Sequence, residues 1–272
     1  MEEYTCECTT DITTFTYHTK SQHAQLLEPH STAEELSAQW RGLVSEYSTL
    51  FITFPSDLLP ALMGVAKPML DISPTRIIAG CWESFLLHDM LWTAQYTYKS
   101  VADKFETSAP SWSWLSTSSS VSYRYARNSD ATLHATLHDV EVDASKGIDD
   151  TFIWSASLSI SAYMIPVILG YNLSHSSDRY IAPDIDSEGK HLRWTAEPDE
   201  SYFGIYGLEK GDRLYCVWMA TLREKTDFGI VLQCLDEEKS VYRRVAAVSH
   251  RLAEKLGETI AAQGKMTRFT LV

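Results

Sequence analysis

An aspartate inside an otherwise apolar segment is the residue best placed to do chemistry. Asp89 shares the apolar side of its segment with Trp82 and Phe85. A carboxylate in that setting must be paired, neutral or functional, because an unpaired buried charge is strongly destabilising. We therefore predict that Asp89 is a catalytic acid or base. The alternative is a structural role, with an indole N–H, a serine hydroxyl or Arg76 as its partner.

Two other types of side chain could act together with that carboxylate. His88 titrates near neutral pH, although adjacent helical residues point about 100° apart, and a solvated polar histidine is the alternative. Tyr123 and Tyr125 alternate along an expected strand and would offer phenolic donors to a bound carbonyl if they face inward. We predict His88 and Tyr123 as further catalytic residues, and Tyr125 and Arg76 as substrate-binding residues.

Tryptophans are the second unusual feature, with eight in 272 residues beside fourteen tyrosines. Ser111-Trp112-Ser113-Trp114 follows Pro110, which favours an extended start, and strand alternation would place both indoles on one side. Together with Trp82 and Trp92 they could form the aromatic wall of an apolar pocket. The alternative is a set of core anchors with satisfied indole N–H groups. We predict all four as substrate-binding residues around a closed cavity.

Motifs for metals, nucleotides and covalent catalysis are missing from the sequence. No G-x-G-x-x-G and no G-x-x-x-x-G-K-S/T occurs, which argues against a nucleotide cradle, and neither G-x-S-x-G nor H-E-x-x-H is found. His134 and His138 lie four residues apart on an alternating strand. A metal pair there lacks a third ligand at matching spacing, so a polar strand edge is the favoured interpretation. We expect no metal site and no cofactor.

Composition and charge exclude several classes of protein. The net charge of −13 at pH 7 (23 − 36) argues against nucleic acid, which needs a basic patch, and against anionic membranes. Apolar residues make up 44% of the chain, which argues against disorder. The N-terminus lacks a secretory signal, and no apolar run approaches the ~20 residues that span a bilayer. Five cysteines without a metal or disulfide pattern indicate reduced thiols, so we expect a cytoplasmic protein.

The elements that position these residues change type near residue 110. A capping box at 31–35 predicts a helix over 33–47, and a second helix is predicted over 58–69. A third, over 81–96, would be apolar around most of its circumference and therefore buried at the centre of the fold. A short helix is predicted over 251–262.

The second half alternates in the manner of strands. The predicted strands are 121–125, 132–142, 151–162, 165–170, 212–222, 229–235, 241–248 and 267–271, and the predicted loops include 174–189 and 196–200. We predict one α+β domain over 1–272, mainly helical over 1–110 and mainly β over 111–272. Its N-terminal helices would pack on a many-stranded, mainly antiparallel β-sheet or barrel.

Several of these segments resemble a known family. Ile78-Ala79-Gly80-Cys81-Trp82, Leu91-Trp92 and Ala109-Pro110-Ser111-Trp112-Ser113-Trp114 resemble the region after the N-terminal domain of fungal heterokaryon-incompatibility (HET) proteins, with its "AGLW…LLW" and "APSWSWAS" motifs. The run Asp57–Ala66 is similar to the family's "D-L-P-A-h-G-h-A" segment, where h is hydrophobic. The resemblance extends from about residue 37 to the end.

The sequence also departs from that family. Cys81 replaces the usual Leu and Leu115 the usual Ala. The "Y-x-A-L-S-Y-x-W-G" motif that opens the family's cell-death domain is missing. The chain is therefore similar to a stand-alone C-terminal HET region, without the part credited with the incompatibility activity.

Two functions fit these observations. The first is a cofactor-independent enzyme of fungal specialised metabolism, which holds a hydrophobic small-molecule substrate and promotes a cyclisation or cycloaddition of the Diels–Alder type by orientation and hydrogen bonding. The alternative, which the resemblance implies, is a non-catalytic interaction or regulatory module in fungal allorecognition. The excess of tryptophan favours the enzyme, and the chain is compatible with a homo-oligomer.

Overall fold

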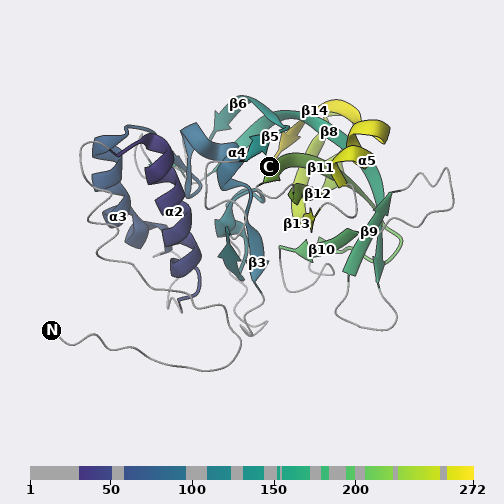
Figure 1. Ribbon diagram of the computed structural model, residues 1–272, viewed down its shortest axis with the longest axis horizontal. Coiled ribbons are helices and arrows are strands. Elements are labelled where there is room, and N and C mark those ends of the chain that lie inside the picture. The colour runs from purple at the N-terminus through teal and green to yellow at the C-terminus, as the bar shows by residue number, and fades with distance from the viewer. Residues whose placement is uncertain are drawn as a thin grey trace.

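The molecule consists of a helical end, a middle layer of short elements and a large sheet, which follow one another in space (Figure 1). The computed structural model describes residues 31–50, 58–95, 109–123, 131–143, 152–153, 155–171, 179–183, 194–199, 206–222, 226–251 and 256–272. The predicted α+β class with a large, mostly antiparallel sheet is confirmed.

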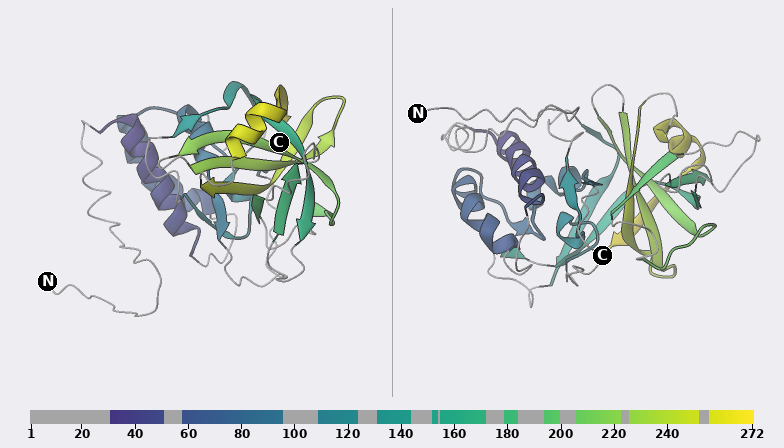
Figure 2. Two further views of the ribbon diagram at one scale, coloured as in Figure 1. Left: turned by 45° about the vertical axis from the view of Figure 1, so that its right-hand side comes forward. Right: turned by 90° about the horizontal axis from the view of Figure 1, so that it is seen from below.

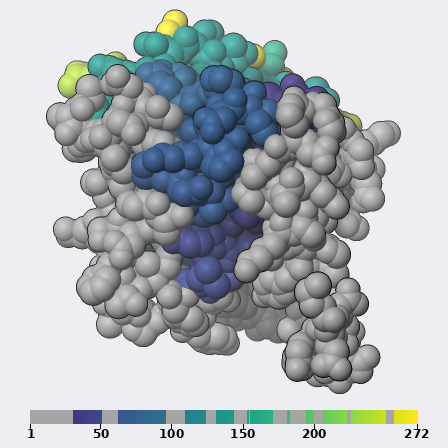
Figure 3. All heavy atoms as spheres, turned by 90° about the vertical axis from the view of Figure 1, so that its left-hand side faces the viewer, coloured from purple at the N-terminus to yellow at the C-terminus, as the bar shows by residue number. Residues whose placement is uncertain are grey.

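The helical end matches the prediction. Helix α2 (Ala33–Tyr47) begins at the expected capping box, in which Thr32 Oγ1 accepts the Glu35 N–H at 3.2 Å and the Glu35 carboxylate accepts the Thr32 N–H at 2.9 Å. Helix α3 (Leu58–Ile72) follows. Residues of the α2 and α3 region reach the surface in the centre of the face that Figure 3 shows. These helices therefore form one end of the molecule.

The prediction of a long third helix over 81–96 is wrong. The segment contains β2 (Cys81–Trp82), the 3₁₀ turn η2 (Glu83–Phe85), α4 (Leu86–Asp89) and β3 (Thr93–Gln95). One reason is that the Asp89 carboxylate accepts the main-chain N–H of Trp82 at 2.8 Å and folds the segment back on itself. Arg244 also binds the carbonyls of Met90 and Trp92, which a continuing helix would use for its own hydrogen bonds. The expected burial of the segment is nevertheless correct.

A two-residue turn joins β1 (Ile77–Ile78) to β2. Ala79 and Gly80 have φ of 47° and 77°, the signs that a type I′ hairpin requires at both central positions. Strand β1 also pairs in parallel with β7 (Phe152–Ile153). Strand β3 pairs with β4 (Ser120–Ser122). These small sheets form the middle layer, and the β1–β7 pairing ties it to the second half of the chain.

Within the described residues, the large sheet contains nine strands. They are β5 (Thr132–Leu133), β6 (Thr136–Val142), β8 (Ala156–Tyr171), β9 (Arg179–Pro183), β10 (Trp194–Pro198), β11 (Arg213–Leu222), β12 (Thr226–Asp236), β13 (Val241–Arg251) and β14 (Lys265–Leu271). The two strands predicted on either side of residue 163 are one long strand, β8. The predicted loops 174–189 and 196–200 contain β9 and most of β10, so those predictions are wrong. Their turn-rich composition concealed short strands that pair only with distant parts of the chain.

The strand pairings return to their starting point. Strand β8 pairs with β11 near its middle and with β9 at its end, while β11 pairs with β12, β12 with β13, β13 with β10 and β10 with β9. Six strands therefore form a closed ring of pairings. A separate apolar cluster belongs to this ring, and α5 (Leu256–Gln263) adds Leu256 and Ile260 to it.

The N-terminal helices contact the middle layer. Trp40 on α2 donates its indole N–H to the Gly80 carbonyl at 2.9 Å, and the Ser48 hydroxyl accepts the Val121 N–H at 2.9 Å. Both views of Figure 2 place the middle layer between the helices and the large sheet. The predicted direct packing of the helices on the large sheet stays a prediction.

Candidate functional site

Two buried arginine–aspartate pairs lie in the core. Arg41 Nη1 is 2.9 Å from Asp89 Oδ1, with side-chain exposures of 2% and 1%. Arg244 Nε is 2.8 Å from Asp199 Oδ2, with exposures of 0% and 2%. Of these four residues, only Asp89 is among the site residues predicted from the sequence. Buried charges of this kind mark either a functional centre or a specific structural device, so their remaining contacts decide what they can do.

The Asp89 carboxylate has a partner on each oxygen. Oδ1 accepts from Arg41 and Oδ2 accepts the main-chain N–H of Trp82 at 2.8 Å, while Arg41 also donates to Ser37 Oγ at 2.7 Å. Burial raises the pKa of the Asp89 carboxyl to about 6, although Arg41 and the Trp82 amide act in the opposite direction. This carboxylate therefore joins α2 to the end of α4.

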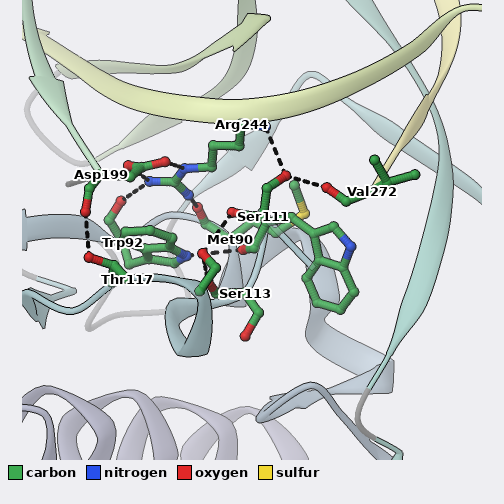
Figure 4. Close-up of polar contacts among 10 residues, drawn as sticks. Met90, Trp92, Ser111, Ser113, Thr117, Asp199, Arg244 and Val272 are labelled. Carbon is green, nitrogen blue, oxygen red and sulfur yellow. Dashed lines mark hydrogen bonds and ion pairs between the residues drawn. The ribbon is translucent and has the colours of Figure 1, made fainter. Parts of the chain in front are cut away.

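The Arg244 guanidinium makes four hydrogen bonds (Figure 4). It donates to both carboxylate oxygens of Asp199, at 2.8 and 3.0 Å, and to the carbonyls of Met90 and Trp92, at 2.6 and 2.7 Å. It also lies over the Trp92 ring at 3.6 Å from its centroid. Arg244 therefore joins β13 to the middle layer.

The neighbouring residue Arg243 has different partners again. Its Nε donates to Gln233 Oε1 at 2.6 Å and its Nη2 to the Tyr206 carbonyl at 2.7 Å. Its guanidinium lies over the Tyr206 ring, 5.1 Å from the centroid. Two adjacent arginines of β13 thus point into different environments, because successive strand residues face opposite sides of the sheet.

Ser111 extends the Arg244 network to the last residue of the chain. Its hydroxyl accepts the main-chain N–H of Arg244 at 2.9 Å and donates to the Val272 carbonyl, which also accepts the Ser111 N–H at 3.1 Å. On the other side, the Thr117 hydroxyl donates to the Asp199 carbonyl (Figure 4). These contacts hold residues 111–117 against the sheet.

The predicted aromatic wall is part of the core. Trp92 donates its indole N–H to the Trp112 carbonyl at 3.1 Å, Trp112 to Ala156 at 3.2 Å and Trp114 to Gly80 at 3.0 Å. Each of the three indoles is at most 2% exposed. Their N–H groups are satisfied by main-chain carbonyls, as expected for core anchors.

The predicted extended conformation of residues 111–114 is wrong. Ser113 N–H donates to the Pro110 carbonyl at 3.0 Å, and a 3₁₀ turn, η4 (Trp114–Ser116), follows. The Ser113 hydroxyl also accepts the Leu115 N–H and donates to the Ala79 carbonyl at 2.6 Å. These local bonds offer the backbone an alternative to a strand, which residue alternation alone does not reveal.

Trp82 differs from the other tryptophans. Its side chain is fully buried, yet its indole N–H has no hydrogen-bond partner among the residues that the structure describes. Buried donors are normally satisfied, so an unpaired one is a candidate contact for a ligand.

Of the remaining predicted site residues, the structure brings Tyr123 into contact with Asp89. The Tyr123 hydroxyl donates to the main-chain carbonyl of Asp89 at 2.9 Å, and burial raises its pKa well above the usual value. His88 is partly buried, which lowers its pKa, with a smaller effect from Arg41. Arg76 pairs with Glu83 near the surface and is not the partner of Asp89. Tyr125 lies outside the described residues.

The two histidines that could have formed a metal pair bind separate partners. His134 Nε2 lies 2.8 Å from Thr221 Oγ1, and His138 Nε2 lies 2.8 Å from Ser161 Oγ. Within the described ranges, no three His, Cys, Asp or Glu side chains gather closely enough to hold a metal ion. Cys81, Cys216 and Cys234 are free thiols, while Cys6 and Cys8 lie in the part of the chain not described.

Part of the network around the two buried arginine–aspartate pairs was not predicted, although a pattern in the sequence indicates it. Ser37, Arg41 and Ser45 on α2 and the C-cap residue Ser48 recur at helical spacing, and all four are buried. Arg244 alternates with Tyr242 on one side of β13. No local signal identifies Asp199, because its role depends on the position of β13.

The fold and these contacts define a β-rich α+β protein whose core is cross-linked by two buried arginine–aspartate pairs. The chain matches no family model, no curated protein and no solved structure. In the part of the chain that the structure describes, no helix has the length and apolar composition needed to cross a membrane.

Proposed function

We propose that the chain is a cytoplasmic, non-catalytic interaction or regulatory module, as its resemblance to the C-terminal region of HET proteins implies. The observation that carries this proposal is the set of bonding partners of the Asp89 and Arg244 side chains. Each of these buried charged groups binds main-chain groups and an oppositely charged side chain of the scaffold. Groups engaged in this way stabilise one arrangement of the core and leave little capacity for proton transfer to a substrate.

The residues that carry the resemblance support the same proposal. Ala79 and Gly80 form the β1–β2 turn, Trp114 donates to the Gly80 carbonyl, and Ser113 donates to the Ala79 carbonyl. These residues have structural roles, so the segments that resemble HET proteins form part of a structural scaffold. In this proposal the ring of strands is a barrel, and α2 and α3 are supported on it through the middle layer.

A binding experiment tests the proposal that the chain is an interaction module. The purified chain is mixed with the isolated HET domain of a fungal incompatibility protein, and complex formation is measured by sedimentation velocity. We expect a complex with a defined stoichiometry, while an unrelated acidic protein of similar size should form none. Separate sedimentation of the chain and the HET domain at every concentration would overturn the proposal. The same runs report whether the chain alone forms a homo-oligomer.

A second candidate is the cofactor-independent cyclase, which the unpaired Trp82 N–H supports. A fully buried indole donor without a partner in the described region could polarise the carbonyl of an apolar substrate. The test is incubation with a linear polyene that carries a conjugated diene and an activated alkene, followed by chromatography of the cyclised product. Acceleration that disappears in Trp82→Phe would support the enzyme, and a rate equal to that in buffer would contradict it.

A further inference from the structure

A second polar cluster lies on the large sheet, away from the two buried ion pairs. His134, directly after β5, places Nε2 at 2.8 Å from Thr221 Oγ1 on β11. The Thr221 hydroxyl donates to Asp227 Oδ1 on β12 at 3.0 Å. Thr221 and Asp227 are cross-strand partners, and the β5–β11 pairing brings His134 beside them. The three side chains therefore form a continuous hydrogen-bonded chain.

The direction of each hydrogen bond in this chain is determined by Asp227. Its carboxylate accepts from Thr221, from Trp218 Nε1 at 3.2 Å and from the Gly257 N–H at 2.8 Å. An ionised carboxylate only accepts, so the single hydroxyl hydrogen of Thr221 is directed at Asp227. The oxygen of Thr221 is then left to accept from His134, which must carry its proton on Nε2. Its lone pair is therefore on Nδ1.

The imidazole is also held in place. Its ring stacks on Trp218 with a centroid distance of 3.5 Å and an interplanar angle of 23°, and the His134 main-chain N–H donates to the Met219 carbonyl at 2.8 Å. Gly257 also lies close against Trp218, because a Cβ at this glycine would be 2.6 Å from the indole. The His134 side chain thus has a fixed position and a fixed tautomer.

The second ring nitrogen of His134 is available. Nδ1 has no hydrogen-bond partner in the described part of the chain, and the residue is only partly buried. Burial lowers the pKa of His134, with Asp227 acting in the opposite direction. The imidazole is therefore neutral at pH 7 and can accept a proton. A base oriented by a second hydrogen-bonded group is the arrangement that general-base sites use.

We propose that Nδ1 of His134 is a proton-accepting site for the hydroxyl group of a phenol-like small molecule. The hydroxyl proton moves to Nδ1 while the electron pair of the O–H bond stays on the ligand oxygen. The imidazolium formed in this way is stabilised through Thr221 by the negative charge of Asp227. This site neither depends on the module proposed above nor shares residues with it.

The chain contains its own control. His138 has an equivalent hydrogen bond, with Nε2 at 2.8 Å from Ser161 Oγ. Among the described contacts of Ser161 there is no carboxylate equivalent to Asp227, so its hydroxyl can donate to or accept from the imidazole. His138 should therefore populate both tautomers, whereas His134 should populate one.

The tautomer is measured first, by nitrogen-15 NMR of the histidine side chains above pH 7.5 in the full chain. We expect His134 to show a protonated Nε2 and an unprotonated Nδ1, and His138 to show averaged values. Thr221→Ser should preserve the His134 pattern and Thr221→Val should abolish it, with circular dichroism verifying the fold. A protonated Nδ1 in the unmodified protein would overturn the proposal, whether or not Thr221→Val folds.

The ligand class is tested on the same side-chain resonances at slightly acidic pH, by titration with 4-nitrophenol, most of which still carries its hydroxyl proton under that condition. We expect the Nδ1 resonance of His134 to move towards its protonated value, to the same extent in Thr221→Ser and by several-fold less in Thr221→Val. His138 should move little. An unchanged His134 resonance at millimolar 4-nitrophenol, or equal changes at both histidines, would contradict the proposed proton-accepting site.

Discussion

Arg41 and Asp89 form a buried ion pair between residues 48 positions apart, with 2.9 Å between Nη1 and Oδ1. The pair connects the middle of α2 with the end of α4, so the helical end and the middle layer are joined by charge as well as by apolar contact. Because both groups are removed from water, their protonation should influence the stability of the fold.

The first prediction concerns the pH dependence of stability. The Asp89 carboxyl has a pKa of about 6 in the folded protein and about 3.9 when unfolded. Between these values the folded state binds more protons than the unfolded state. The free energy of unfolding should therefore fall as the pH rises from about 4 to about 6, by up to about 3 kcal/mol. Urea unfolding, followed by tryptophan fluorescence at each pH, measures this change.

Asp89→Asn is the control for that measurement. It should remove this part of the pH dependence and lower stability at pH 7 by about 3–5 kcal/mol, because Arg41 loses its buried carboxylate. The lowered pKa of His88 acts with the opposite sign, since its folded form resists protonation below about pH 6.5. The difference between the two proteins isolates Asp89, and an identical pH slope in both would contradict the prediction.

The second prediction compares two adjacent arginines. Arg244→Met should lower the free energy of unfolding by about 3–5 kcal/mol, because it breaks the buried ion pair with Asp199 by removing one of its two charges. Arg243→Met removes a partly exposed residue with two hydrogen bonds and should cost about 1–2 kcal/mol. Urea unfolding at pH 7 measures both. Equal losses would show that the Arg244 network is not a special stabilising element.

The third prediction concerns the turn at Gly80. A Cβ there would lie 2.7 Å from Trp114 Nε1, and φ is +77°. At Gly207, φ is +70°, but among the described residues no heavy atom beyond the two chain neighbours lies within 4 Å of the added Cβ. Gly207→Ala should therefore cost about 1–2 kcal/mol for its backbone conformation alone. Gly80→Ala should cost about 1–3 kcal/mol more, from steric overlap. Thermal unfolding by calorimetry measures the difference, and similar Tm values would contradict it.

The fourth prediction uses the unpaired N–H of Trp82. Phenylalanine in place of either Trp82 or Trp112 removes similar volume. Within the described part of the chain, only Trp112 loses a hydrogen bond, to the Ala156 carbonyl. Trp112→Phe should be less stable than Trp82→Phe by about 1–3 kcal/mol, because the Ala156 carbonyl is left without that donor. Chemical unfolding measures both variants. A larger loss in Trp82→Phe would show that its N–H has a partner after all.

Local patterns predicted those elements whose stability is local. The capping box and the helical spacing of Leu36, Trp40 and Val44 define α2 correctly, because caps and apolar faces act within a few residues. The failure at residues 81–96 has the opposite cause. Apolar residues around the whole circumference indicate burial, but they do not distinguish a buried helix from a folded-back segment.

The apolar residues around Asp89 were enough to predict that this carboxylate is buried and needs a partner. Its actual partner, Arg41, became known from the folded arrangement. The same holds for the bonds of Arg244 to Asp199 and to the carbonyls of Met90 and Trp92. A buried charge requires compensation wherever it lies, and the sequence reveals that requirement. Which group supplies the compensation depends on packing between distant elements, and no local pattern contains that information.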